Sequence, residues 1–243
     1  MLILGIDSST EVAAVGLYED GKILGEMNIS LYRRHSERLM PNIDHLFNEL
    51  GLDIKNIDGI AVTVGPGSFT GLRIGISTVK GFAQVLDVPV VGVSTLDLIA
   101  YNLNYVEGWV VPLLDARRKR VYTSLYKMQG NNNNIFQSKE WEDQALPIDE
   151  LIYNLSDHCD HNGKPGAYYL IGNGVNIYRD ELVDQELNLI LTPPSYHKPR
   201  GGAVAELGQI LLQKGKSCNV DHLVPNYLKK PQAEINYKKI GSE

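Results

Sequence analysis

The sequence is poor in the features of secreted and membrane proteins. Only two of its 243 residues are cysteines, Cys159 and Cys218, and they do not form a CxxC pair. No apolar run approaches the roughly 20 residues that span a bilayer. The first residues lack the basic start and small-residue cleavage site of a signal peptide, and their apolar pattern predicts a strand. We therefore expect a reduced, cytoplasmic protein without a membrane partner.

Basic residues are outnumbered. The chain has 23 lysines and arginines against 29 aspartates and glutamates, which gives a formal net charge of -6. Such a surface repels RNA unless basic groups cluster locally. The only dense cluster is Arg117-Arg118-Lys119-Arg120. The chain alone is therefore predicted to bind RNA weakly, and a partner would supply most of the binding energy in any RNA chemistry.

The first hundred residues show a regular succession of strand and helix patterns. Apolar or alternating runs predict strands at 2–6, 12–18, 23–28, 60–64 and 89–93. Asp20-Gly21 predicts a tight hairpin turn. Apolar residues at helical spacing predict helices at 36–50 and 71–86, and the capping-box spacing from Ser94 to Asp97 begins a third helix. The order β-β-β-α-β-α-β is typical of a ribonuclease-H-like lobe.

A second, less regular lobe is expected from residue 106. Strands are predicted at 109–114, 120–126 and 168–171 and a helix at 202–214, whereas 137–166 has no interpretable pattern. The predicted fold class is α/β, with two ribonuclease-H-like lobes of the actin, sugar-kinase and heat-shock chaperone superfamily. The predicted domains are residues 1–105, which would carry a partner interface, and residues 106–243.

The most informative motif is a glycine-rich stretch between a strand and a helix, Gly65-Pro66-Gly67-Ser68-Phe69-Thr70-Gly71-Leu72-Arg73-Ile74-Gly75. It is not a Walker A loop, because no Gly-Lys-Ser/Thr follows, and Thr70 stands where a dinucleotide fingerprint has its third glycine. Its backbone N–H groups could bind an anion, and Gly71 and Gly75 leave room for another backbone to approach. A tight turn inside the monomer core explains the same residues equally well.

Turns at strand ends indicate a nucleotide cleft between the lobes. In the actin-like superfamily an acidic residue at the position of Asp7 faces the metal and phosphate of a nucleotide, and Asp115 takes the matching position in the second lobe. Ser9 replaces the glycine that lets phosphate approach. Gly172 and Gly174 form a turn that could pack on an adenine ring. The alternatives are an Asx-turn at Asp7, a surface pair between Asp115 and a neighbouring arginine, and an ordinary glycine connection.

No motif assigns a catalytic residue or a metal ligand. His158-Cys159-Asp160-His161 and Cys218 with His222 match no common zinc spacing. Ser68 does not lie in the Gly-x-Ser-x-Gly elbow of hydrolases. The strand at 60–64 ends without the acid that a ribonuclease-H-type nuclease needs. We expect a chain with no catalytic residue and no metal site.

Several motifs together resemble the TsaB family of the bacterial tRNA threonylcarbamoyladenosine machinery. They are residues 1–10, the glycine-rich stretch, Pro-Val-Val-Gly-Val-Ser-Thr at 89–95, Asp115-Ala116-Arg117 with Val121-Tyr122, and Pro225-Asn226-Tyr227-Leu228. The resemblance covers most of the chain and is strongest over residues 1–126. The catalytic paralogue TsaD carries a related glycine stretch.

This resemblance implies a non-catalytic subunit. TsaD transfers a threonylcarbamoyl group to adenosine beside the tRNA anticodon, using a metal held by two histidines. Thr95 and Ile99 stand about where those histidines would be, and neither ligates a metal as imidazole does. The implied partners are TsaD, the ATPase TsaE and a second copy of the chain, with tRNA reached through the complex. No tightly bound cofactor is expected, and ATP or ADP would bind only in the complex.

Two other functions are weighed against this one. An ATP-dependent small-molecule kinase of the actin-like superfamily would use Asp7, Asp115 and the glycine turn at 172–174. A peptidase would need a nucleophile elbow or a metal site, and the sequence has neither.

Family members pair through helices of the first lobe, as homodimers or with TsaD, in a four-helix contact. The implied interface residues are Leu39, Ile43, Leu46, Phe47, Phe69, Gly71, Leu72, Arg73, Gly75, Ile76 and Val79. A charge at Ile43 or Leu72 is expected to weaken pairing while leaving the fold intact. The alternative is that both helices only cover their own sheet.

Overall fold

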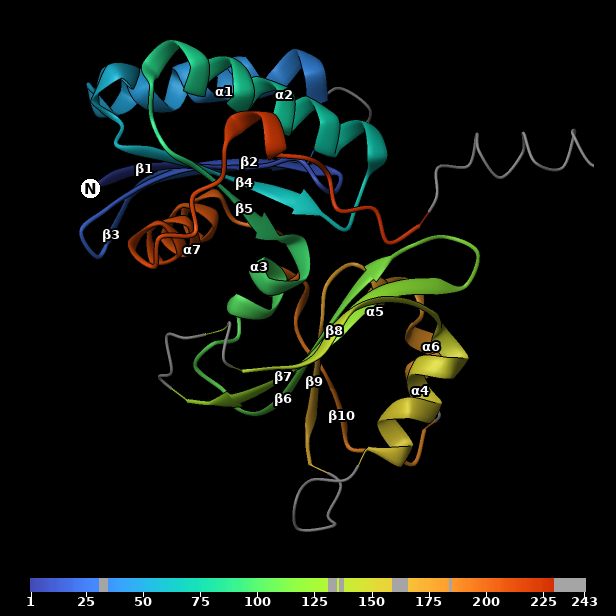
Figure 1. Cartoon of the computed structure of the whole chain (residues 1–243). Helices are drawn as coiled ribbons and strands as arrows, with labels where there is room; N and C mark the ends of the chain where they lie inside the picture. The colour runs from blue at the N-terminus through green and yellow to red at the C-terminus, as the bar shows by residue number, and fades with distance from the viewer. Residues whose placement is uncertain (31–34, 131–134, 136–137, 159–165, 184, 230–243) are drawn as a thin grey trace, which may run out of the picture.

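The chain folds into two lobes, each built on a five-stranded mixed sheet (Figure 1). A computed structural model describes residues 1–30, 35–130, 135, 138–158, 166–183 and 185–229. The predicted α/β class with two lobes of ribonuclease-H-like topology is confirmed.

The first sheet contains β1 (Leu2–Asp7), β2 (Val12–Glu19), β3 (Lys22–Ser30), β4 (Gly59–Gly65) and β5 (Val90–Ser94), in the order β3-β2-β1-β4-β5. β1, β2 and β3 form an antiparallel meander, and β4 and β5 continue in parallel from β1. The predicted hairpin turn is confirmed, because Asp20 and Gly21 both have positive φ, at 44° and 88°. Four of the five predicted strands lie within these elements, and the fifth, 89–93, begins one residue before β5.

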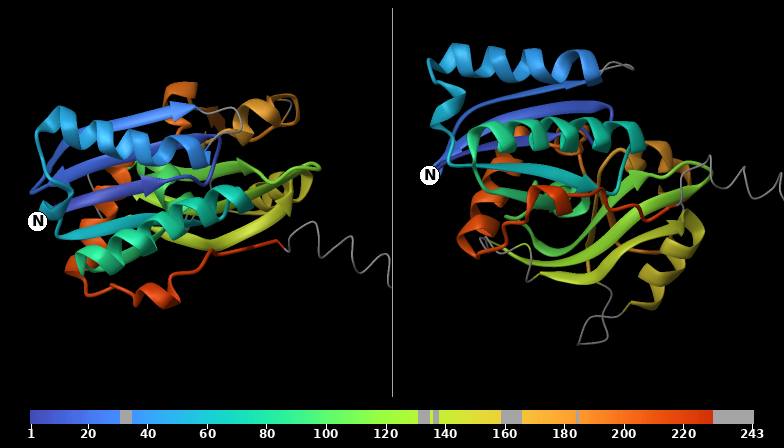
Figure 2. Two further views of the ribbon diagram at one scale, coloured as in Figure 1. Left: turned by 90° about the horizontal axis from the view of Figure 1, so that it is seen from above. Right: turned by 45° about the horizontal axis from the view of Figure 1, so that its top comes forward.

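Helices α1 (His35–Leu50) and α2 (Phe69–Leu86) cover one face of this sheet and contact each other (Figures 1 and 2). A short 3-10 turn, η1 (Ile54–Asn56), precedes β4. The apolar stripe of α1 faces inward, as its helical spacing predicts: Leu39, Ile43, Leu46 and Phe47 are buried. The outer faces of α1 and α2 form the outermost layer of the first lobe.

The second sheet repeats the path of the first. Its elements are β6 (Glu107–Asp115), β7 (Arg120–Gln129), β8 (Lys139–Pro147), α4 (Ile148–Asp157), β9 (Tyr168–Ile171), α5 (Gly174–Ile177), α6 (Arg179–Val183) and β10 (Leu189–Leu191), and its order is β10-β9-β6-β7-β8. An antiparallel meander is again followed by two parallel strands. The sequence pattern missed β8 because β8 is rich in charged residues and mostly half-buried; it is a strand because β7 offers its backbone for pairing.

Helix α7 (Gly201–Gln213) packs on the first sheet, on the face opposite α1 and α2 (Figure 1). A Cβ atom on Gly5 of β1 would lie 2.3 Å from the Ala205 nitrogen, and one on Gly16 of β2 would lie 2.2 Å from the Gly202 nitrogen. Only glycine permits so close an approach of two backbones. Two 3-10 turns, η3 (Pro194–Tyr196) and η4 (Val220–His222), flank α7.

The predicted domain boundary needs a correction. The prediction assigned all residues after 105 to the second lobe, but α7 packs on the first sheet. Beyond α7, Cys218 bridges to Val90 of β5, and the Asn226 N–H donates to the Val64 carbonyl at 2.6 Å. In space, the first lobe therefore includes residues 201–227, because apolar α7 finds its partner surface there rather than on the adjacent sheet.

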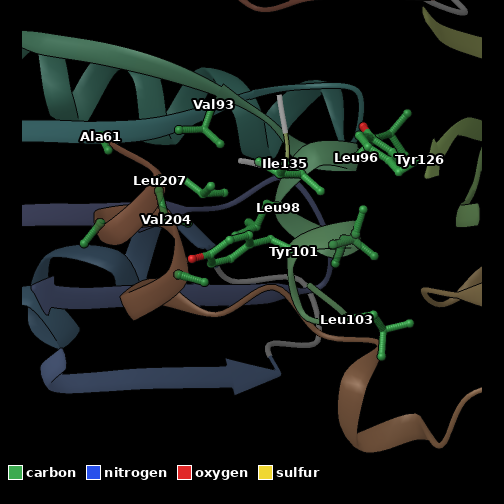
Figure 3. Close-up of a cluster of buried hydrophobic side chains, with 14 of the residues drawn as sticks. Ala61, Val93, Leu96, Leu98, Tyr101, Leu103, Tyr126, Ile135, Val204 and Leu207 are labelled. Atoms are coloured by element: carbon green, nitrogen blue, oxygen red, sulfur yellow. The ribbon is translucent and has the colours of Figure 1, made fainter. Parts of the chain in front are cut away.

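Helix α3 (Thr95–Tyr101) lies between the lobes and joins their cores. Figure 3 shows side chains from the first sheet, α3, α7 and the second lobe in one apolar cluster, which includes Val93, Leu98, Tyr126 and Leu207. The two lobes thus share a continuous core.

A buried ionic network crosses the same junction. Lys139 of β8 lies 2.9 Å from Asp97 of α3 and 2.6 Å from Asp143, and Tyr126 donates to Asp97 at 2.6 Å. Ser94 accepts from the N–H groups of Leu96 and Asp97, so the predicted helix start is correct, and its hydroxyl also donates to Asp143 at 2.8 Å. Asp97 therefore serves mainly as an anchor for the second lobe.

We expect Gly16→Ala to cost about 3 kcal/mol or more of unfolding free energy, because the added Cβ meets helix backbone that cannot move aside. Gly81→Ala on α2 is the matched control. No described residue lies within 4 Å of the position of its Cβ, so this change should stabilise the chain by up to about 1 kcal/mol. Urea unfolding measures both; equal stability of the Gly16 variant and the wild type would contradict the assigned contact.

Removing the central cation of the ionic network should be strongly destabilising. Lys139→Met leaves two buried carboxylates together, at an expected cost of about 3–5 kcal/mol. The pKa of Asp97 is already raised by burial and is held down by Lys139, so it rises further in the variant. The loss should therefore be larger at pH 8 than at lower pH, where Asp97 becomes protonated. Lys216→Met, at an exposed position, should have little effect at either pH.

Candidate functional site

A cleft of about 730 Å³ opens between the two lobes. It is lined by residues of the β1–β2 turn, of the glycine-rich stretch and of the second lobe: Ser9, Thr10, Glu11, Gly67, Ser68, Phe69, Thr70, Ile74, Leu114, Asp115, Ala116, Arg117, Tyr122 and Asn173. Its volume is that of a small-molecule site. Of the five predicted cleft residues, Ser9 and Asp115 line it.

Asp7 lies beneath this cleft and is fully buried. Its Oδ1 accepts from the hydroxyls of Ser9 and Thr63, each at 2.6 Å, and from the Ser9 N–H at 3.3 Å. Its Oδ2 has no hydrogen-bond partner among the described residues. Burial raises the pKa of Asp7 to about 6, and the Ser9 and Thr63 hydrogen bonds oppose that rise. The carboxyl therefore ties the turn to β4, as the Asx-turn alternative predicts.

The glycines of the 65–75 stretch pack against the β1–β2 turn of the same chain. A Cβ on Gly71 would lie 1.9 Å from the Ser8 carbonyl oxygen, and one on Gly67 would lie 2.3 Å from the Ser9 carbonyl oxygen. The Ser68 N–H donates to that Ser9 oxygen at 2.7 Å. The backbone that approaches Gly71 closely is therefore that of Ser8 in the same chain. The stretch is a tight turn inside the monomer core, which was the alternative to an anion cradle.

On the second lobe, Asp115 is held by hydrogen bonds to its neighbours. Its Oδ1 accepts from the Tyr178 hydroxyl at 2.7 Å and the Arg117 N–H at 2.8 Å. Asn173 lines the cleft and accepts from the Asp115 N–H at 3.0 Å. Gly172 and Gly174 pack instead on the Leu113 backbone. The cleft offers hydroxyls and Arg117, but the two predicted adenine-turn glycines do not line it, so nucleotide binding stays a prediction.

The predicted interface residues are mostly buried within the first lobe. Nine of the eleven are buried, namely Leu39, Ile43, Leu46, Phe47, Gly71, Leu72, Gly75, Ile76 and Val79. They cover their own sheet, as the alternative stated. From this burial we predict that a charge at Ile43 or Leu72 disrupts the core, in place of the expectation that the fold survives it. Arg73 is exposed, and Phe69 stacks on Tyr227 with ring centroids 4.8 Å apart.

The outer face of α1 and α2 presents a different set of residues. Met40 of α1 is 47% exposed and Val85 of α2 is 83% exposed. Ser77 and Gly81 of α2 are exposed as well, and none of the described residues lies within 4 Å of a Cβ placed on Gly81. A glycine inside a helix costs about 1 kcal/mol relative to alanine, and here no contact among the described residues requires it. We call this surface the α1–α2 outer face.

The two positions where the resemblance implies metal-binding histidines in TsaD lie in the core of this chain. Thr95 and Ile99 are both fully buried. Across the described residues, no three His, Cys, Asp or Glu side chains gather closely enough to hold a metal ion. His158 contacts Tyr168 and Trp109; residues 159–161 of that motif lie outside the described part of the chain. None of the helices described is both long and apolar enough to cross a bilayer.

Comparison with known proteins gives a consistent result. A family model described as "TsaD: tRNA N6-adenosine threonylcarbamoyltransferase" matches residues 23–237. TsaB of Bacillus subtilis is 29% identical to the chain, and the match covers 98% of each protein. TsaB of Escherichia coli is 30% identical, over 94% of this chain and 95% of its own length. Two solved structures from Pseudomonas aeruginosa, YeaZ and a protein described as similar to the peptidase YeaZ, superpose with TM-scores of 0.73 and 0.76. Their identities are 25% and 26%, and each match covers at least 93% of both chains.

The duplicated lobes define the fold class, an α/β protein of two ribonuclease-H-like lobes with a cleft between them. Within that class, the chain belongs to the TsaB family of tRNA threonylcarbamoyladenosine biosynthesis proteins, which the TsaD family model also matches. The resemblance seen in the sequence is thereby confirmed.

Asp7 should make the stability of the chain depend on pH. Because the folded-state pKa is raised from 3.8 to about 6, the folded state holds the proton more tightly than the unfolded chain. The resulting stability is fully present below pH 4 and is lost as pH rises through 6, to a total of roughly 3 kcal/mol. Asp7→Asn should lack this loss. Unfolding free energies of both proteins at pH 4 and pH 8 measure most of it; parallel pH profiles would contradict a buried, ionisable Asp7.

Proposed function

We propose that the chain is a non-catalytic subunit that binds TsaD and activates it for threonylcarbamoyl transfer to adenosine beside the tRNA anticodon. Membership of the TsaB family supports this role. The burial of Asp7 and the presence of Thr95 and Ile99 in the core, where TsaD is expected to place metal-binding histidines, support a non-catalytic chain. TsaE and a second copy of the chain are the other proposed partners, with tRNA reached through the complex.

The main support for an interface on the α1–α2 outer face is the exposed position of Gly81. This glycine lies exposed in the C-terminal half of α2, costs the helix stability, and is not required by any contact with the residues that the structure describes. A backbone or side chain of another molecule approaching α2 closely would require it, because small residues permit close helix packing. Ser77 one turn earlier extends the same small surface, and Met40 and Val85 supply exposed apolar groups. Two such faces would form a four-helix contact of roughly 1,600 Å².

Activation would act on the conformation of TsaD. Binding favours one arrangement of TsaD only if the α1–α2 outer face has unequal affinity for the alternatives. The buried stripe beneath this face keeps both helices fixed on their sheet, so the chain offers a rigid template. Such a template loses little conformational entropy on binding.

Gly81→Arg should separate pairing from folding. The side chain has open space in the monomer, and arginine is a better helix former than glycine, so the melting temperature should be unchanged or higher. Pairing with TsaD should weaken at least about tenfold, since the arginine would have to be desolvated or displaced. Co-purification with TsaD and tRNA modification with TsaD, TsaE, tRNA and threonylcarbamoyl-adenylate are the two measurements.

Gln213→Arg, exposed at the end of α7 and equal in charge change, is the control and should pair normally. Full pairing by the Gly81 variant would place the interface elsewhere. Modification that proceeds equally well without the chain would defeat the proposed function itself.

A further inference from the structure

The turn between β6 and β7 has an unusual backbone. Arg117, Arg118 and Lys119 all have positive φ, at 61°, 56° and 55°. This left-handed conformation brings the Cβ of an L-residue close to the following carbonyl, and glycine or asparagine adopts it at lower cost. Three consecutive long side chains in it are therefore a local departure from the most stable choice. Such departures persist where the surroundings hold the chain in place.

The turn is fixed from several sides. The Ala116 N–H donates to the Arg120 carbonyl at 2.9 Å, and the Ile148 N–H of α4 donates to the Lys119 carbonyl at 3.0 Å. Lys229, which follows the segment crossing the first lobe, donates to the Ala116 carbonyl at 2.7 Å. With the bonds of Asp115 described above, these contacts make the turn a rigid part of the second lobe.

The charged groups of the turn remain available. Arg117, Arg118 and Lys119 are exposed. Lys119 lies 3.7 Å from Glu181, and Glu11 and Asp115 line the cleft with Arg117. Within the described residues, no ion pair engages Arg117 or Arg118, and no hydrogen bond engages the N–H groups of Arg118 and Lys119. Two guanidinium groups and two free N–H groups thus occupy one rigid turn.

We propose that this turn contacts the phosphate backbone of tRNA in the assembled complex, an inference that rests on the proposed function. Arginine presents paired N–H donors that match phosphate oxygens, and neighbouring free backbone N–H groups also favour anions. Glycine or asparagine would adopt this backbone at lower conformational cost. The turn nevertheless has cationic side chains, at the expense of some stability. An acidic chain with one such turn makes few phosphate contacts, which fits a subunit that contributes to RNA binding beside a partner.

The test is the double substitution Arg117→Asn with Arg118→Asn in the complex with TsaD. Asparagine tolerates the left-handed region, so the variant should melt no lower than the wild type. Binding of an unmodified tRNA transcript should weaken about tenfold. The negative slope of log affinity against log salt should become shallower by about 1.4 to 1.8, because two phosphate contacts are lost. Co-elution with TsaD should be unchanged.

Lys22→Asn with Lys55→Asn is the control of equal charge. Both lysines are exposed, at the end of the first sheet where β1 begins, whereas the cleft lies where β1 ends. Unchanged tRNA affinity of the arginine variant, or an equal loss in the control, would overturn the proposal. Loss of TsaD pairing by the arginine variant would show that the turn meets a protein instead and would also overturn it. Failure of the unsubstituted chain to pair with TsaD is a separate readout and defeats the proposed function.

Discussion

The backbone contact between α7 and the first sheet determines much of the remaining architecture. Gly5 and Gly16 of the sheet and Gly201 and Gly202 of the helix remove the side chains that would hold the two apart. Side chains of β3 complete the contact: Asn28 accepts from the Gly201 N–H at 2.9 Å, and Glu26 accepts from the Gly202 N–H at 3.0 Å. These bonds satisfy helix N–H groups that would otherwise lack partners.

Because α7 returns to the first lobe, the segment after it runs along α2 and reaches the second lobe at Lys229. Tyr227 stacks on Phe69 beside Arg73, whose guanidinium carbon lies 3.9 Å from the Phe69 ring centre. Lys229 then reaches the β6–β7 turn. The α1–α2 outer face, the cleft and the basic turn are therefore held in one frame, joined also by the Lys139 network and the shared core.

Residues that resemble a nucleotide site serve packing in this chain. The glycines after β4 admit the Ser8-Ser9 backbone, and Asp7 secures the same turn from below. The features that the monomer does not use lie on its surface, at Gly81 and in the turn around Arg118. At both places the local sequence is less stable than a simple alternative, and conflicts of this kind are expected where function takes precedence over stability.

The sequence by itself determined the two-lobed α/β order, the Asp20-Gly21 hairpin and the inward stripe of α1, because hydrophobic period and turn chemistry are local properties. Its motifs also identified the TsaB family. Only the tertiary structure decided that α7 belongs to the first lobe, that β8 is a strand, and that Leu72 and Ile76 are core rather than contact surface. The same stripe fits a sheet or a partner equally well, and a glycine's purpose depends on which atoms approach it. Those are contacts between distant segments, and no local pattern encodes them.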